Sequence, residues 1–209
     1  MARKPKITNQ QILEAAREIF LQQGFGGSTI EIAQLAGISE ALIFKRFSTK
    51  EELFLAAMGL PEKAVWMKEL ENLCGKGDIK ENLIQVCFAI LEFYSEVMPR
   101  FMMLRSRGNA IPENCMIKEQ GPVQDVKVLT DFLEQEISLS RLRPVNAKII
   151  AHVLVGTLMN YVLAEQIQFS PNSCQTEAVH AFDLKQQPKL EFSFVQGLIE
   201  AIWQGIAPI

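Results

Sequence analysis

The chain has 209 residues, 48% of them hydrophobic, and carries a net charge of −3. This length and apolar content allow one large or two modest globular domains and exclude an intrinsically disordered chain. Residues 1–50 hold seven Lys and Arg against four Glu, whereas residues 51–209 hold fourteen against twenty acidic residues. The basic front and acidic remainder predict nucleic-acid contact at the front only.

The sequence predicts a soluble, cytoplasmic protein that needs no metal or cofactor. No charged stretch followed by an apolar run opens the chain, as a secretory signal would require. The longest uncharged apolar run, 149–164, is sixteen residues long and falls short of a membrane span. The cysteines show no metal-ligand or C-x-x-C spacing, so we expect reduced thiols.

A first helix is predicted from Thr8, because Thr8 and Gln11 have the spacing of a capping box, and Gly24 ends it. Its apolar face is formed by side chains at helical spacing: Ile12, Ala16, Ile19 and Phe20. This helix would bury one side of the next two helices. The basic tail before it, residues 1–6, contacts the DNA backbone or minor groove, or remains a solvated terminus.

Two short helices joined by a tight turn come next. Ser28 and Glu31 have capping-box spacing and start one helix, Gly37 supplies a residue that tolerates positive φ, and Ser39 is a suitable N-cap for the other. Two helices crossed over a turn of this length form a helix-turn-helix. A third helix is predicted behind them, opened by a capping box at Ser48.

The polar residues of this region that are not needed for its apolar core favour a phosphate-binding domain over a plain helical bundle. Basic side chains gather at the end of the second short helix: Lys45, Arg46 and Lys50. Hydroxyls stand at predicted helix starts: Ser28, Thr29 and Ser39. Hydroxyls and backbone amides at such positions, together with Lys and Arg, are the groups that bind DNA phosphates.

Gly59, Leu60 and Pro61 mark a domain boundary or a hinge. Beyond them, the predicted regular elements are all helices. The expected helices are 79–97, 122–137, 144–169 and 190–205, with a short segment after Pro99 and loops over 108–121 and 170–188. The helix 144–169 should be the longest, and the last helix carries two parallel apolar stripes. More apolar face than one domain can bury predicts a homodimer through residues 149–168 and 190–203.

Flexible apolar side chains in the second part are candidates for a ligand pocket, although single residues of this kind are more often plain core. We expect this pocket to be lined by Trp66, Phe88, Phe93, Phe101 and Met102, with Arg105 beside them. No catalytic constellation is present, so we expect no enzyme. His152 is expected to be a buried, hydrogen-bonded core residue.

The run TIEIAQLAGISEALIFKRFSTKEELF, preceded by ITNQQILEAAREIFLQQGF, resembles the DNA-binding domain of the TetR family of bacterial transcriptional regulators. The resemblance covers roughly residues 7 to 55, and beyond residue 60 it is one of layout only. It implies an all-α fold: a three-helix helix-turn-helix domain over residues 1–58, then a helical ligand-binding and dimerisation domain over 59–209.

The resemblance also assigns roles to individual residues. The family positions that contact phosphates correspond to Ser28, Thr29, Phe44, Lys45 and Lys50. Phe44 replaces the usual Tyr and lacks the hydroxyl for that contact, so its ring can only pack or meet a thymine methyl. Residues that reach the operator run from Ser39 to Lys45, and those facing base edges are Glu40, Ala41 and Leu42. Glu40 either accepts from a cytosine amino group or only favours the start of its helix.

The function implied is a regulator, most often a repressor in this family, that leaves an inverted-repeat operator when a small apolar or amphipathic molecule binds. Two alternatives remain. One is a DNA-binding regulator controlled without an inducer. The other is a helical dimer that binds a small molecule or a partner and no DNA.

Overall fold

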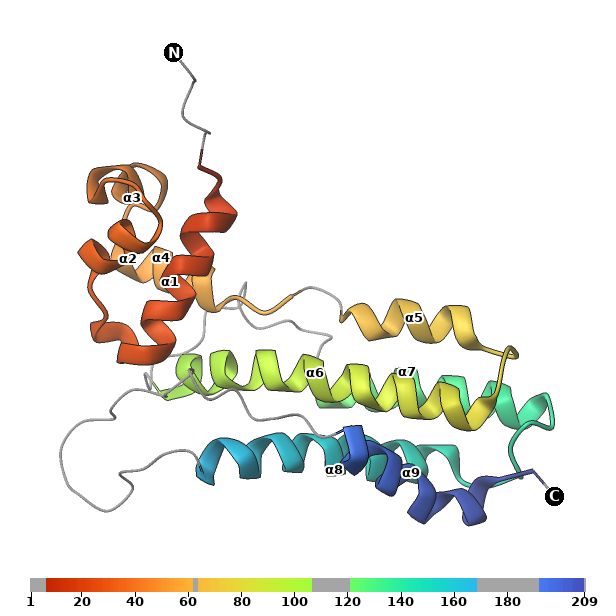
Figure 1. The fold of residues 1–209 in the computed structure, drawn as a ribbon. Coiled ribbons are helices and arrows are strands. Elements are labelled where there is room, and N and C mark those ends of the chain that lie inside the picture. Colours follow the sequence, from red (N-terminus) through yellow and green to blue (C-terminus); the bar gives the residue numbers. More distant parts are fainter. Residues whose placement is uncertain (1–6, 62–63, 107–120, 169–191, 209) are drawn as a thin grey trace. The chain divides into compact units, whose positions relative to one another are not determined.

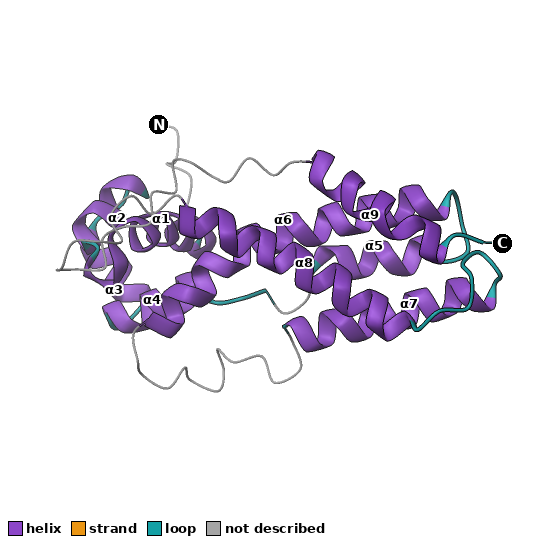
Figure 2. Cartoon of the chain, turned by 90° about the horizontal axis from the view of Figure 1, so that it is seen from below, coloured by secondary structure: helices purple, strands orange, loops and turns teal. Residues whose placement is uncertain are grey.

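A computed structural model describes residues 7–61, 64–106, 121–168 and 192–208, and in these ranges all regular elements are helical (Figures 1 and 2). This confirms the predicted all-α fold class. The elements are α1 Asn9–Gln23, η1 Gly24–Gly26, α2 Thr29–Leu35, α3 Glu40–Arg46, α4 Lys50–Met58, α5 Val65–Leu73, α6 Ile79–Ser106, α7 Pro122–Ser138, α8 Ala147–Gln168 and α9 Phe192–Ile206. The predicted tail 1–6, the loop 170–188, all but the last residue of the loop 108–121, and positions 190–191 of the predicted interface lie outside the described residues.

The chain divides into two compact units. Within the described ranges, unit 1 contains residues 7–60, 99–106 and 168, and unit 2 contains residue 61 and residues 64–98, 121–167 and 192–208. The first segment of unit 1 ends at Leu60, close to the boundary predicted after residue 58. Helix α6 belongs to both units, because its residues from Pro99 onward lie in unit 1.

Unit 1 is a cluster of short helices around aromatic and aliphatic side chains. The fully buried members include Ile12, Phe20, Ile32, Ile43, Leu53 and Phe54. The rings of Phe20 and Phe54 meet edge to face with their centroids 5.1 Å apart, a favoured aromatic geometry. Leu104 of α6 is buried in the same core. Unit 1 is therefore completed by a residue distant in sequence from α1 to α4.

Helix α6 runs through Pro99, where the sequence predicted an end. A proline inside a helix removes one backbone hydrogen bond and crowds the carbonyl four residues earlier. The turns after Pro99 are nevertheless helical to Ser106, and Leu104 and Met103 in them pack in the core of unit 1. Burial of these side chains offsets the local cost. As a result α6, at 28 residues, is longer than α8, at 22 residues, which was predicted to be the longest helix.

The caps of the short helices differ in detail from those predicted. Thr8 and Gln11 do form the capping box of α1. Ser28 caps α2, but its hydroxyl accepts from the Ile30 amide, and no reciprocal box with Glu31 forms. The predicted box at Ser48 is wrong by one residue, because Thr49 is the N-cap of α4 and its hydroxyl accepts from the Glu52 amide at 3.0 Å.

Unit 2 is a bundle of α5, most of α6, α7, α8 and α9. Its buried core includes Trp66, Leu83, Ile90, Leu91, Leu129, Leu154, Leu158 and Ile199. At one end, the completely buried carboxylate of Glu136 accepts hydrogen bonds from the Gly75 amide and the Arg141 guanidinium. Arg141 in turn donates to the carbonyls of Lys76 and Gly77. This network fixes the turn between α5 and α6 to the end of α7.

Helix α8 is long and apolar enough to cross a membrane over Ala147–Gln166, which corrects the expectation that this run falls short. The helix is longer than the uncharged run because it includes flanking residues on both sides. One such helix is weak evidence for a membrane span, because core helices pass the same test. In α8 one side is buried in unit 2, with Ala151, Leu154 and Leu158 fully covered.

Candidate nucleic-acid interface

Helices α2 and α3 and the turn between them form a helix-turn-helix. Gly37 takes the positive φ of 67° that the turn requires. The Ile38 amide donates to the Ala33 carbonyl at 2.9 Å, which closes the turn against the end of α2. Ala33 and Ile43 are buried between the helices. The turn chemistry expected at Gly37 is thus confirmed.

The outer side of α3 carries the side chains predicted to reach DNA. Ala41, Phe44 and Lys45 are exposed and Leu42 is half-buried, whereas Ile43 points inward and is fully buried. Phe44 keeps 41% of its surface exposed although it is a large aromatic residue. An exposed aromatic beside an exposed lysine on one short helix is a candidate contact surface.

The four basic side chains of residues 7–60 are used differently from one another. Arg17 donates to the Ala57 carbonyl, and Arg46 donates to the Asn9 side chain and the Ile7 carbonyl. Lys50 donates to the Gly26 carbonyl at 3.3 Å and lies over the Phe25 ring. Lys45 alone is exposed without a hydrogen bond or ion pair to any described residue. Arg46, grouped with Lys45 and Lys50 from the sequence, therefore holds α3 to the start of α1.

Two of the hydroxyls predicted to contact phosphates, those of Ser39 and Thr29, differ in the bonds that they make. Ser39 is the N-cap residue of α3, but its side chain makes no capping bond and is exposed. The Thr29 hydroxyl donates to Glu40 Oε1, which links the first residues of α2 and α3. Neither this link nor the bonds of Arg46 could be found from the sequence, because each joins segments that only the folded chain brings together.

The six predicted pocket residues are divided between the two units. Trp66 is buried in unit 2, and Phe88 and Phe93 are half-buried there, with the Phe88 ring edge-on to Phe192 at 5.3 Å. The other three are exposed and belong to unit 1: Phe101, Met102 and Arg105. This division arises because α6 continues past Pro99 and its last residues belong to unit 1.

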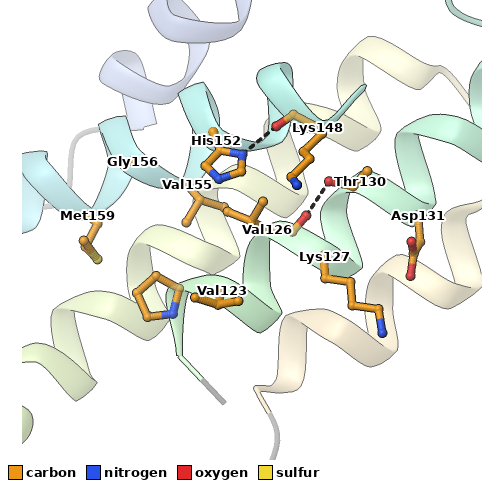
Figure 3. Close-up of a pocket in the computed structure, with 11 residues that line it drawn as sticks. Val123, Val126, Lys127, Thr130, Asp131, Lys148, His152, Val155, Gly156 and Met159 are labelled. Carbon is orange, nitrogen blue, oxygen red and sulfur yellow. Dashed lines mark hydrogen bonds between the residues drawn. The ribbon is translucent and has the colours of Figure 1, made fainter. Parts of the chain in front are cut away.

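A groove of about 590 Å³ lies between α7 and α8 of unit 2, within the size range of small-molecule sites (Figure 3). Its apolar surface comes from Pro122, Val123, Val126, Val155 and Met159, and its polar lining from Lys127, Thr130, Asp131, Lys148 and His152. His152 was expected in the core, but it is exposed, and its Nδ1 lies 2.8 Å from the Lys148 carbonyl. The wrong expectation arose because His152 interrupts an apolar run on the outward side of α8.

The buried polar pair of unit 2 is formed by Tyr94 of α6 and Asp125 of α7. The Tyr94 hydroxyl donates to Asp125 Oδ2 at 2.5 Å, and both residues are almost fully covered. Burial raises the pKa of Asp125 to about 6, and the hydrogen bond from Tyr94 opposes part of that rise. Burial and the neighbouring carboxylate raise the pKa of Tyr94.

Helices α8 and α9 expose apolar side chains on the faces predicted for a partner chain. Ile149 and Val153 of α8 are 59% and 41% exposed. In α9, one predicted stripe is half-buried: Phe194, Leu198 and Ile202. Most of the other stripe is buried in unit 2, with Val195, Ile199 and Ile206 covered and Trp203 half-buried. The two stripes thus differ in exposure, as the sequence pattern suggested.

Comparison with known proteins identifies the N-terminal region. Residues 12–57 match the family described as bacterial regulatory proteins of the tetR family, a segment that spans most of α1 and all of α2, α3 and nearly all of α4. Residues 12–57 therefore form a DNA-binding region of the TetR family. Within 83 residues it is 34% identical to the transcriptional repressor AcnR of Corynebacterium glutamicum, a match covering 39% of this chain and 43% of that protein.

A second relative is the transcriptional regulator AcrR of Shigella flexneri, 38% identical over 98 residues, which cover 44% of this chain and 46% of that protein. The matched region thus spans less than half the length of these curated relatives. Both are transcriptional regulators, which supports the expectation of a non-enzymatic protein.

A solved TetR-family structure from Mesorhizobium loti shares the fold over nearly the whole chain. It aligns with a TM-score of 0.65 and 17% identity, covering 95% of this chain and 96% of that one. At this identity the likeness shows the fold alone. The TetR-type arrangement of a helix-turn-helix region and a larger helical region therefore extends beyond the part recognised in sequence.

Proposed function

We propose that this protein is a TetR-family DNA-binding transcriptional repressor that recognises an inverted-repeat operator in the cytoplasm. The observation that carries the proposal is the helix-turn-helix of unit 1, whose α3 presents Ala41, Phe44 and Lys45 outward. In a helix-turn-helix the second helix lies in the major groove while the first crosses the backbone. Lys45 would contact phosphate, with Ser39 and Lys50 beside it.

An inverted repeat follows if the protein is a homodimer through residues 149–168 and 190–203. The exposed Ile149 and Val153 on α8 and the half-buried stripe of α9 support this interface, because apolar helix faces of this kind are normally covered. A two-fold dimer places two recognition helices in successive major grooves, about 34 to 36 Å apart or slightly more.

The effector is proposed to bind unit 2 and to weaken operator binding. It would do so only through a higher affinity for the conformation that is incompetent for DNA, since a ligand with equal affinity for both shifts nothing. Helix α6 supports such coupling because it contributes residues to both units. The groove between α7 and α8 and the core around Trp66 are candidate places for the effector.

Selection of genomic DNA fragments by the purified protein tests the proposal, with the Lys45→Ala/Lys50→Ala double variant as control. An inverted repeat that is enriched by the wild type and lost with the variant is expected. If no fragment is enriched, the alternative of a helical small-molecule-binding or interaction dimer without DNA binding replaces the proposal. The enriched fragment then serves as the probe for effectors, and a regulator without an inducer would show no ligand response.

A further inference from the structure

Glu40 opens the recognition helix, and its carboxylate is held in place before any DNA is bound. Oε1 accepts the hydrogen bond from the Thr29 hydroxyl, and the side chain is half-buried. A carboxylate offers about four acceptor positions on its two oxygens. The bond to Thr29 occupies one of them and restricts rotation of the side chain, so that Oε2 remains as an oriented acceptor.

The position of Glu40 places this acceptor among the exposed side chains of α3. Glu40 is four residues before Phe44, so the two lie on one face of the helix, and the exposed Ala41 is next to them. The N-terminal residues of a recognition helix are those that contact base edges in the major groove. Glu40 therefore occupies a base-reading position with a group that can only accept hydrogen bonds.

An ionised carboxylate selects strongly among base edges. Cytosine presents the N4 amino donor, whereas guanine presents two acceptors and thymine one acceptor and a methyl group. Adenine presents the N6 amino donor beside the N7 acceptor. The second oxygen of the carboxylate would face N7, and two acceptors repel each other. The base edge that best matches Glu40 is therefore that of cytosine.

The charge of Glu40 also acts on DNA that offers no such edge. Residues 7–60 hold four basic against six acidic side chains, and only Lys45 among the four basic ones is without a hydrogen-bond partner in the described chain. Non-specific DNA binding depends on cations that neutralise phosphates. With so few cations in residues 7–60, one carboxylate at the interface lowers the affinity for non-cognate DNA appreciably.

We propose that Glu40, positioned by Thr29, is a specificity-determining residue that reads a cytosine in each half-site and disfavours DNA lacking it. The inference rests on the proposed DNA-binding function. It differs from a purely structural role, in which Glu40 would only tie α3 to α2 and its loss would lower stability without changing base preference.

The test is selection of bound duplexes from a random-sequence pool by the full-length wild type and by Glu40→Gln, Glu40→Ala and Thr29→Val. The wild type should enrich a C·G pair at one symmetric position. Glu40→Ala should lose preference there by about tenfold and nowhere else. Glu40→Gln keeps an acceptor for Thr29 and should shift that position toward A·T. Thr29→Val keeps the charge and should weaken the preference at the same position.

Anisotropy titrations with the enriched duplex and a scrambled duplex give the second readout. Glu40→Gln should bind the scrambled duplex more tightly than the wild type does, whereas Glu18→Gln, which removes the same charge from the exposed face of α1, should not. Unchanged base preference in both Glu40 variants, with folding verified by circular dichroism, overturns the inference. Absence of any enriched sequence for the wild type overturns the proposed function itself.

Discussion

Replacing Asp125 by Asn should raise the stability of unit 2, compared with that of the wild type, as the pH rises. Burial raises the pKa of Asp125 from 3.8 to about 6, so the folded state binds this proton more tightly than the unfolded state. The stabilisation that comes from the bound proton is complete below the unfolded pKa and is lost as the pH rises through about 6. At ~1.36 kcal/mol per unit of pKa difference between the folded and unfolded states, the full loss amounts to about 3 kcal/mol.

The two tryptophans, Trp66 and Trp203, both lie in unit 2, so their fluorescence reports its unfolding in urea. We expect the unfolding free energy of Asp125→Asn minus that of the wild type to increase by about 2.4 kcal/mol between pH 4 and pH 7, because part of the full change falls below pH 4. The subtraction, at one protein concentration, removes the contribution of the other carboxylates and any constant cost of the amide. A difference that does not vary with pH would refute the reasoning.

Three further predictions concern charge, caps and the partner face. Lys45→Ala should weaken binding to all DNA sequences and reduce the slope of log affinity against log salt by about one unit in titrations from 50 to 200 mM salt; a change in base preference at unchanged slope would contradict the phosphate contact. Thr49→Ala should lower the unfolding free energy of unit 1 by about 1 kcal/mol, whereas Ser48→Ala, at the cap predicted from sequence, should not. Ile149→Asp should shift the protein toward monomer in analytical ultracentrifugation, and Val65→Asp, equally apolar and more exposed on α5, should leave the dimer intact.

The local structure of unit 1 was predictable because its signals are short in range. Gly37 and the Thr8 capping box depend on neighbours a few residues away, and the structure has them as expected. Thr49 in place of Ser48 shows the limit of such reasoning: both hydroxyls have an acidic residue three positions later, and only the path of the chain decides which of them caps α4.

The features that were predicted wrongly or missed have a different cause. Pro99 carries a strong local signal for a helix end, but the burial of Leu104 in unit 1 opposes it, and no local pattern contains that contact. His152 was placed in the core because its sequence neighbours are apolar, although the same neighbours include the exposed Ile149 and Val153. The pairing of Thr29 with Glu40 joins two helices and requires their crossing geometry, which sequence spacing does not provide.

The place of Leu104 in the core of unit 1 affects how the protein can be divided and recombined. A fragment ending at Leu60 would lack this buried side chain, and filling such a site typically accounts for about 2 to 5 kcal/mol. A domain of only about 60 residues has little stability in reserve. A chimera that joins this DNA-binding region to the effector region of a relative should therefore also keep residues 99–106 of this chain. Without them the DNA-binding region would lose the buried Leu104.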